Sequence, residues 1–125
     1  MKALSVTGRI LFSLLYIYAG LNHFINASTL ASGVPSFVQG GIIWVYITGM
    51  IMLAGGILLI INMYVRAGAI MIALLMLVFV FTVHVPGIFN PEQRNFALGF
   101  AFNNLALAGA AFFIAGTANY EGKII

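Results

Sequence analysis

The chain has very little charge and no cysteine. Only 6% of its 125 residues are charged and 63% are hydrophobic, whereas soluble domains average about 25% charged residues. So few charged side chains could not cover the surface of a soluble domain, and the composition predicts an integral membrane protein. The absence of cysteine excludes disulfides, thiolate nucleophiles and cysteine-held metal or iron–sulfur sites. Aspartate is also absent, and a net charge of +3 is too small for a nucleic-acid surface.

Four apolar segments are long enough to cross a bilayer, which takes about 20 residues each. They cover roughly residues 4–24, 41–62, 66–86 and 96–117. Backbone groups in lipid must satisfy their own hydrogen bonds, and no strand-like alternation is present, so all four segments are predicted helices. The first contains Arg9 and lacks a small-x-small cleavage site, so we expect a retained helix and not a signal peptide. The predicted fold is a single all-α domain over residues 1–125, a bundle of four transmembrane helices.

Positive charge is unevenly divided between the two ends of these helices. Lys2, Arg9, Arg66 and Lys123 belong to the end that holds both termini, and Arg94 alone belongs to the other end. Because basic residues are retained on the cytoplasmic side, both termini are predicted to be cytoplasmic. The longest loop, residues 25–40, is expected to hold a short interfacial helix around residues 28–31.

The two halves of the sequence resemble each other weakly. Residues 53–60 read LAGGILLI and residues 107–114 read LAGAAFFI. The first and third spans each begin near an arginine and end near a histidine, His23 and His84. This pattern indicates two helical hairpins related by a parallel repeat, although recurrence of Leu, Ala and Gly through composition alone is an equally open interpretation.

Polar and small residues form a stripe along the first span. Arg9, Ser13, Tyr16, Gly20 and His23 are spaced four, three, four and three apart, and therefore share one helix face. Lipid disfavours such a face, so it is predicted to point into the bundle or toward a partner. For Ser13 and Gly20 we favour simple helix packing. Tyr16 and His23 fit packing or function, and Arg9 fits an interfacial anchor or a contact to a lipid or quinone headgroup.

Small residues also predict contact faces on the second and fourth spans. The members of these faces are Gly49 and Gly56, and Gly99, Asn103, Ala106 and Ala110. A hydrogen bond between Thr48 and Asn103 would join the two helices. The faces would serve packing inside one chain or formation of a homo-oligomer equally well.

Polar groups gather at the end opposite the termini, and an ionisable residue at membrane depth indicates function. The candidate ligand-binding residues are His23, His84, Tyr16, Asn22, Asn103 and Arg9. Histidine exchanges protons near neutral pH, and two facing histidines can also hold haem. The bulky Phe and Leu interior argues against haem, and no third ligand supports a metal site. The alternative is that each histidine simply reaches the headgroup layer.

Several phrases occur in an order that resembles the DoxX family of small bacterial membrane proteins. They are residues 8–11 GRIL, 19–24 AGLNHF, 33–35 GVP, Gly49 with 53–56 LAGG, 84–86 HVP and 104–110 NLALAGA. The resemblance implies a four-helix bundle in the bacterial plasma membrane. Some members are subunits of thiosulfate:quinone oxidoreductase, others are linked to oxidative-stress complexes, and most have no established activity. Many members have a glutamate where this chain has Met52, and a longer, acidic, Gly-rich third loop.

Three functions remain open from the sequence. The first is an accessory or quinone-interacting subunit of a membrane oxidoreductase, with His23, Tyr16, His84 and Asn103 as hydrogen-bonding groups. The second is a non-enzymatic membrane module that binds lipid, a small apolar ligand or a partner subunit. The third is a small transporter, which rests on the repeat alone. A thioether at Met52 cannot carry protons as a carboxylate can, which weighs against proton chemistry coupled to quinol.

Overall fold

The computed structural model describes residues 2–119 and 121–124. Its elements are α1 (Lys2–Ile25), α2 (Ala27–Ala31), α3 (Ile42–Ile60), α4 (Val65–Phe79), the π-helix η1 (Val80–His84), α5 (Val85–Ile88) and α6 (Arg94–Thr117). Four helical stretches are long and apolar enough to cross a membrane: Lys2–Ile25, Ile42–Ile60, Val65–Ile88 and Arg94–Thr117. The prediction of an all-α membrane protein with four spans is confirmed, and α2 lies where the short interfacial helix was expected.

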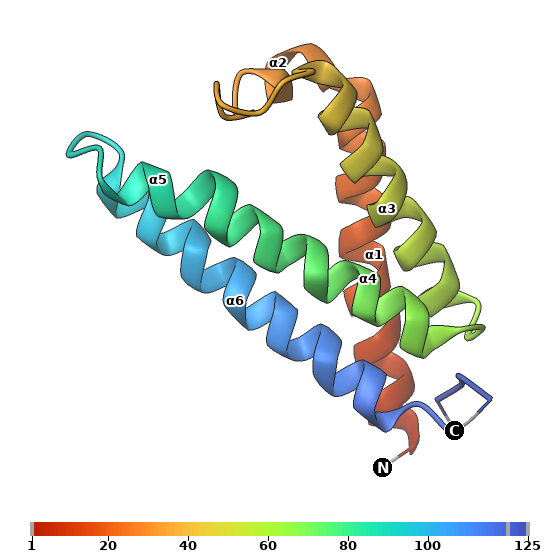
Figure 1. Ribbon diagram of the computed structural model, residues 1–125. Helices are drawn as coiled ribbons and strands as arrows, with labels where there is room; N and C mark the ends of the chain where they lie inside the picture. Colours follow the sequence, from red (N-terminus) through yellow and green to blue (C-terminus); the bar gives the residue numbers. More distant parts are fainter. Residues whose placement is uncertain (1, 120, 125) are drawn as a thin grey trace.

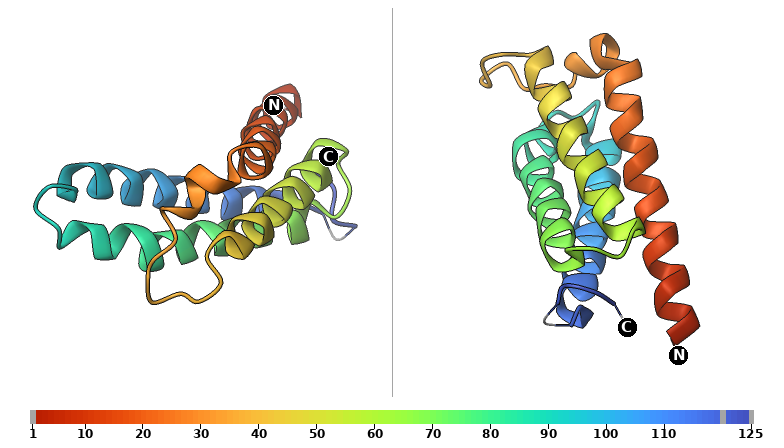
Figure 2. Two further views of the ribbon diagram at one scale, coloured as in Figure 1. Left: turned by 90° about the horizontal axis from the view of Figure 1, so that it is seen from above. Right: turned by 90° about the vertical axis from the view of Figure 1, so that its right-hand side faces the viewer.

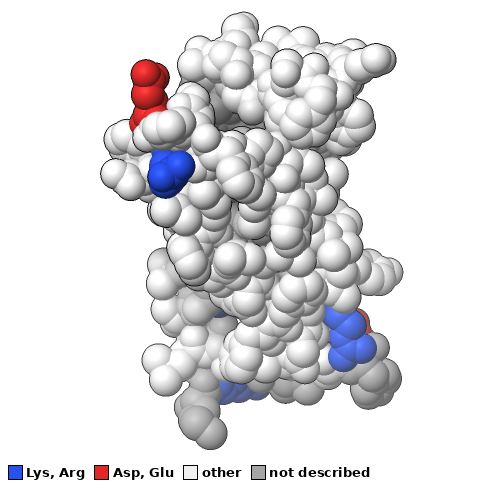
Figure 3. Space-filling view, turned by 60° about the vertical axis from the view of Figure 1, so that its left-hand side comes forward, with Lys and Arg blue, Asp and Glu red and all other residues white. Residues whose placement is uncertain are grey.

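The four spans form two antiparallel hairpins, α1 with α3 and α4 with α6 (Figure 1). The hairpins converge at the end that holds both chain termini and diverge at the end that holds α2 and α5, which gives the molecule a V shape. The view from above in Figure 2 shows the two hairpins running in different directions. Charged side chains on the face in Figure 3 lie near the two ends, and the middle is uncharged, as a bilayer requires.

Glycine allows α1 and α3 to approach backbone to backbone. A Cβ atom on Gly20 would lie 2.6 Å from Leu53 Cγ and 2.9 Å from the Gly49 carbonyl oxygen. A Cβ atom on Gly49 would lie 2.6 Å from His23 Cβ. Both spaces are too small for any side chain, so the glycines fix the spacing of this hairpin. The predicted contact face of the second span is therefore confirmed, since Gly56 also packs against α1, at Ile17.

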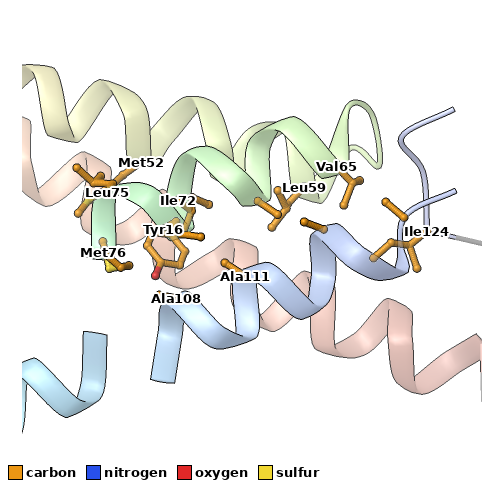
Figure 4. Packing of buried hydrophobic residues seen from close by; sticks show 14 residues of the cluster. Tyr16, Met52, Leu59, Val65, Ile72, Leu75, Met76, Ala108, Ala111 and Ile124 are labelled. Atoms are coloured by element: carbon orange, nitrogen blue, oxygen red, sulfur yellow. The ribbon is translucent and has the colours of Figure 1, made fainter. Parts of the chain in front are cut away.

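Tyr16 lies in the core where the hairpins cross (Figure 4). Its side chain is 1% exposed and belongs to the same cluster as Ile72, Met76, Ala108 and Ala111. In Figure 4 the ring points from α1 toward α4 and α6, with its hydroxyl near Met76 and Ala108. The Tyr16 hydroxyl has no hydrogen-bond partner among the described residues. The aromatic ring thus joins the first hairpin to the second through apolar contact.

An arginine near the start of each hairpin binds the carbonyl groups at its other end. Arg9 donates from Nη1 to the carbonyl oxygens of Leu59 and, at 3.1 Å, Ile60. Arg66 donates from Nη2 to the carbonyl oxygen of Ala118 at 2.7 Å, just after α6. The last carbonyls of a helix lack partners within the helix, and a cation there also complements the helix dipole. The recurrence of this arrangement supports an internal repeat.

The C-terminal residues dock on the loop between α3 and α4. Val65 N–H donates to the Gly122 carbonyl at 2.6 Å. The Asn62 side chain makes two hydrogen bonds to the backbone of Ile124. It accepts from the Ile124 N–H at 3.0 Å and donates to the Ile124 carbonyl at 3.2 Å. Ile124 is buried within the hydrophobic cluster. These bonds hold the converging end of the V closed.

The predicted contact face of the fourth span does not pack inside the chain, and its use in a homo-oligomer stays a prediction. Its members Gly99, Asn103, Ala106 and Ala110 are exposed, and a Cβ atom on Gly99 would meet nothing within 4 Å. The buried face consists of Ala97, Ala101, Asn104, Ala108, Ala111 and Ala115. Small residues occur on both faces of α6, so spacing alone did not identify the face that packs inside the chain. The predicted Thr48–Asn103 bond is wrong, since the Thr48 hydroxyl donates to the Trp44 and Val45 carbonyls of its own helix.

Candidate ligand-binding site

A cavity of about 330 Å³ lies between the two hairpins, and His23 and His84 are both on its wall. The wall comes from the end of α1, from α2 and the loop after it, from the first turns of α3, and from the end of α4 with η1. Its other polar side chains are Thr48, Thr82 and the indole of Trp44, and the remainder is apolar. This size and lining are typical of sites for small ligands, in which a few polar groups orient an apolar molecule.

His23 is held in one orientation by its own helix. Its Nδ1 lies 2.7 Å from the carbonyl oxygen of Ala19, one turn earlier. A carbonyl oxygen can only accept, so Nδ1 carries the proton in the neutral ring. The other ring nitrogen, Nε2, is therefore a hydrogen-bond acceptor.

A change of helix type places His84. Val85 N–H donates to the Val80 carbonyl, a spacing of five residues that defines the π-helical segment. Pro86 has no N–H, so it cannot form the usual α-helical bond to the Thr82 carbonyl, and the helix can widen here. The extra residue turns the side chains that follow relative to a regular α-helix, and this rotation sets the direction of the His84 ring.

Asn104 on α6 fixes the His84 ring. The amide nitrogen Nδ2 of Asn104 lies 3.0 Å from His84 Nε2, and the ring of Phe100 stacks on the imidazole at a centroid distance of 5.7 Å. An amide nitrogen donates, so Nε2 of the neutral His84 accepts and Nδ1 carries the proton. The two histidines of the cavity thus have opposite characters, because His23 offers an acceptor and His84 offers a donor.

The other candidate residues lie away from the cavity wall. Tyr16 is buried in the core of the crossing, and Arg9 binds carbonyls near the end of α3. Asn22 accepts a hydrogen bond from Asn26 at 2.6 Å. Asn103 is exposed on the outer face of α6. The structure therefore brings together His23 and His84 alone of the six.

Sequence reasoning missed Asn104, Trp44 and Thr82 as neighbours of the two histidines. Asn104 is 9% exposed and directly follows the asparagine that was selected. Only the rotation of α6 distinguishes the two asparagines, and its small residues left that rotation undefined. Trp44 could have been noticed as the single tryptophan of the chain, at the start of a span.

The two adjacent asparagines provide a matched pair of variants. Asn104→Ala is expected to lower the free energy of unfolding by about 1–2 kcal/mol, because it leaves a partly buried ring nitrogen of His84 without its partner. It should also release the His84 tautomer, so that the ¹⁵N chemical shifts of Nδ1 and Nε2 in nuclear magnetic resonance spectra move toward each other. Asn103→Ala should change neither quantity, since the Asn103 side chain is exposed. Equal effects of the two variants would contradict the assignment of Asn104 to His84.

Comparison with known proteins agrees with this architecture. A sequence model of the DoxX family matches residues 4–85, more than half of the chain. The match covers both histidines and most of the first three spans, and ends within the third, before α6. No curated protein and no solved structure matches the chain. The protein is therefore a member of the DoxX family with four membrane-spanning helices.

Proposed function

We propose that this DoxX protein binds a quinone-type, lipid-soluble ligand between its hairpins, as the quinone-interacting subunit of a membrane oxidoreductase. The observation that carries the proposal is the position of His23 and His84 on the wall of one largely apolar cavity. The cavity volume of about 330 Å³ is suited to a single substituted ring with part of an apolar tail.

The residues on the wall fit such a headgroup chemically. A quinone accepts hydrogen bonds at its carbonyl oxygens, and the Nδ1–H group of His84 is a suitable donor. Reduction converts those carbonyls to hydroxyls, and the Nε2 atom of His23 is a suitable acceptor for one of them. A bound quinone would supply the redox chemistry, and the two histidines would orient its ring and exchange protons at its oxygens.

The orientation in the membrane follows from the charge distribution. We place both termini in the cytoplasm of a bacterium and the cavity in the outer half of the plasma membrane, because Lys2, Arg9, Arg66 and Lys123 belong to the converging end. A partner subunit, soluble or membrane-bound, would exchange electrons with the ligand, since the chain has no cysteine for a thiol relay.

A second function is favoured by the absence of carboxylates from the described cavity wall. No Asp or Glu lines it, and the second span has Met52 where many relatives have a glutamate. The protein would then hold a lipid or another small apolar molecule, or seat a partner subunit, without electron transfer. Binding without any effect of ligand redox state on a partner enzyme would support this second function over the first.

Trp44 offers a direct test of ligand binding. It is the single tryptophan and lies on the cavity wall, and quinones quench indole fluorescence at short range. Titration of the detergent-purified protein with a short-chain benzoquinone is expected to quench Trp44 to saturation. In the His23→Phe/His84→Phe double variant the dissociation constant should rise about fivefold, which is the effect of losing the hydrogen bond of about 1 kcal/mol that His84 Nδ1–H would donate to a quinone carbonyl.

Tyr18→Phe is the matched control for this titration. Tyr18 is on α1, 70% exposed and away from the cavity wall, so its hydroxyl should not affect quinone affinity. Unchanged affinity for the benzoquinone in the double histidine variant would contradict the proposal. Linear, unsaturable quenching of the unmodified protein would do the same, since it indicates quinone dissolved in the micelle.

A further inference from the structure

The polar side chains on the cavity wall have already used most of their hydrogen-bond donors. Trp44 Nε1–H donates to the Gln39 carbonyl at 2.6 Å. The Thr48 hydroxyl donates to the Trp44 carbonyl at 2.8 Å, and the Thr82 hydroxyl donates to the Val78 carbonyl at 2.7 Å. Each threonine oxygen keeps lone pairs but has no second proton to donate.

The two histidines complete this inventory. The His23 Nδ1–H group is engaged with the Ala19 carbonyl, which leaves the Nε2 lone pair as an acceptor. The His84 Nε2 lone pair is engaged with the Asn104 amide, which leaves Nδ1–H as a donor. The described side chains of the wall therefore offer acceptors at His23, Thr48 and Thr82, and one donor at His84.

From this imbalance we infer that the cavity selects a ligand that donates hydrogen bonds, namely the hydroxyl-bearing quinol and not the quinone. The inference rests on the proposed function and refines its ligand. A quinone has two carbonyl acceptors, and the described side chains of the wall offer one donor for them. A quinol has two hydroxyl groups, each of which donates one bond and accepts another. Acceptors that meet no donor in a largely apolar site are unfavourable, so the wall discriminates against the quinone.

The preference has a consequence for the redox couple. Tighter binding of the reduced form makes the bound quinone easier to reduce than the free one. For a two-electron couple, a tenfold difference in affinity corresponds to a rise of about 30 mV in the midpoint potential. A tenfold preference for quinol is the effect that we expect.

A series of four compounds of similar shape tests this inference. They are tetramethylbenzoquinone, the corresponding quinol, its monomethyl ether and its dimethyl ether, titrated into the detergent-purified full chain by calorimetry without oxygen. Affinity is expected to follow the number of hydroxyl groups, with the quinol about tenfold tighter than the dimethyl ether and the quinone. The dimethyl ether is the control for size and apolar contact, since it has no proton to donate.

The two histidines should affect the series in opposite ways. His23→Phe removes an acceptor, so it should weaken binding of the quinol more than binding of the quinone and reduce the preference for quinol. His84→Phe removes the donor, so it should weaken binding of the quinone more than binding of the quinol and increase the preference for quinol. These opposite changes cannot result from general loosening of the fold.

Each outcome separates this inference from the proposed function. If neither quinone nor quinol binds, the proposed function is wrong and the inference falls with it. If both bind and the quinone is as tight as the quinol, the inference is overturned and the proposed function stands. The inference assigns the quinol preference to hydrogen-bond acceptors on this wall, His23 among them. A quinol preference that His23→Phe leaves unchanged would therefore also overturn the inference.

Discussion

The substitution Gly20→Leu is expected to separate α1 from α3 and to lower the free energy of unfolding by about 3 kcal/mol or more. A Cβ atom at this position would lie 2.9 Å from two backbone atoms, Gly49 O and Leu53 N. Backbone atoms cannot rotate away as a flexible side chain can, so the helices themselves must move apart. The change can be measured by unfolding the purified protein in mixed micelles with increasing SDS and following helicity by circular dichroism.

Gly8→Leu is the control on the same helix. A Cβ atom on Gly8 would meet nothing within 4 Å, and leucine favours helix more than glycine does. This variant is expected to be as stable as the unmodified protein or slightly more stable. If Gly20→Leu and Gly8→Leu unfold at the same SDS fraction, close packing at Gly20 does not hold the first hairpin together.

Arg9→Met is expected to destabilise the protein by about 2–4 kcal/mol. The Arg9 side chain is 5% exposed and binds the carbonyl oxygens of Leu59 and Ile60. Methionine retains an unbranched apolar chain but removes the charged donor from both carbonyls, and among the described residues only the Leu59 carbonyl keeps a second donor, the Asn62 N–H at 3.2 Å. Hydrogen bonds from a charged donor contribute about 1.5–3 kcal/mol each. Arg9→Lys should recover part of the loss, since it restores a positive donor without the fork of the guanidinium.

Lys123→Met provides the comparison for loss of charge alone. Lys123 pairs with Glu121 at 3.8 Å with both side chains about half exposed, and such surface pairs contribute about 0–1 kcal/mol. The same SDS titration should therefore find little change. A comparable loss in Arg9→Met and Lys123→Met would show that Arg9 acts through net charge and not through the carbonyls of α3.

The sequence predicted the spans well because length and composition determine them. The stripe on α1 was also predicted, since the polar and small residues there occupy a single face, and Arg9, Ser13, Tyr16 and Gly20 are indeed its buried residues. On α6 the small residues lie all around the helix, so their spacing contains no information on rotation. Packing against α4 selects the face of Ala97, Ala101 and Asn104.

The cavity was beyond sequence reasoning for two physical reasons. Its existence depends on the divergence of two hairpins, which is set by contacts at the opposite end of the molecule. The direction of the His84 side chain depends on the π-helix at Val80–His84. The extra residue in its turn changes the angular position of His84 about the helix axis from the one that a regular period of 3.6 residues would predict. The sequence did place His23 and His84 at the same end of their spans, because helix length alone determines depth.

The V shape makes the protein a wedge within the bilayer (Figure 1). Its cross-section is narrow where the termini lie and wide where the hairpins diverge, so it displaces unequal areas of the two lipid monolayers. Such a wedge is accommodated best where the monolayer on the wide side is stretched, that is, on the convex side of a curved membrane. The shape of the fold thus links this protein to membrane curvature and lateral pressure, through geometry alone.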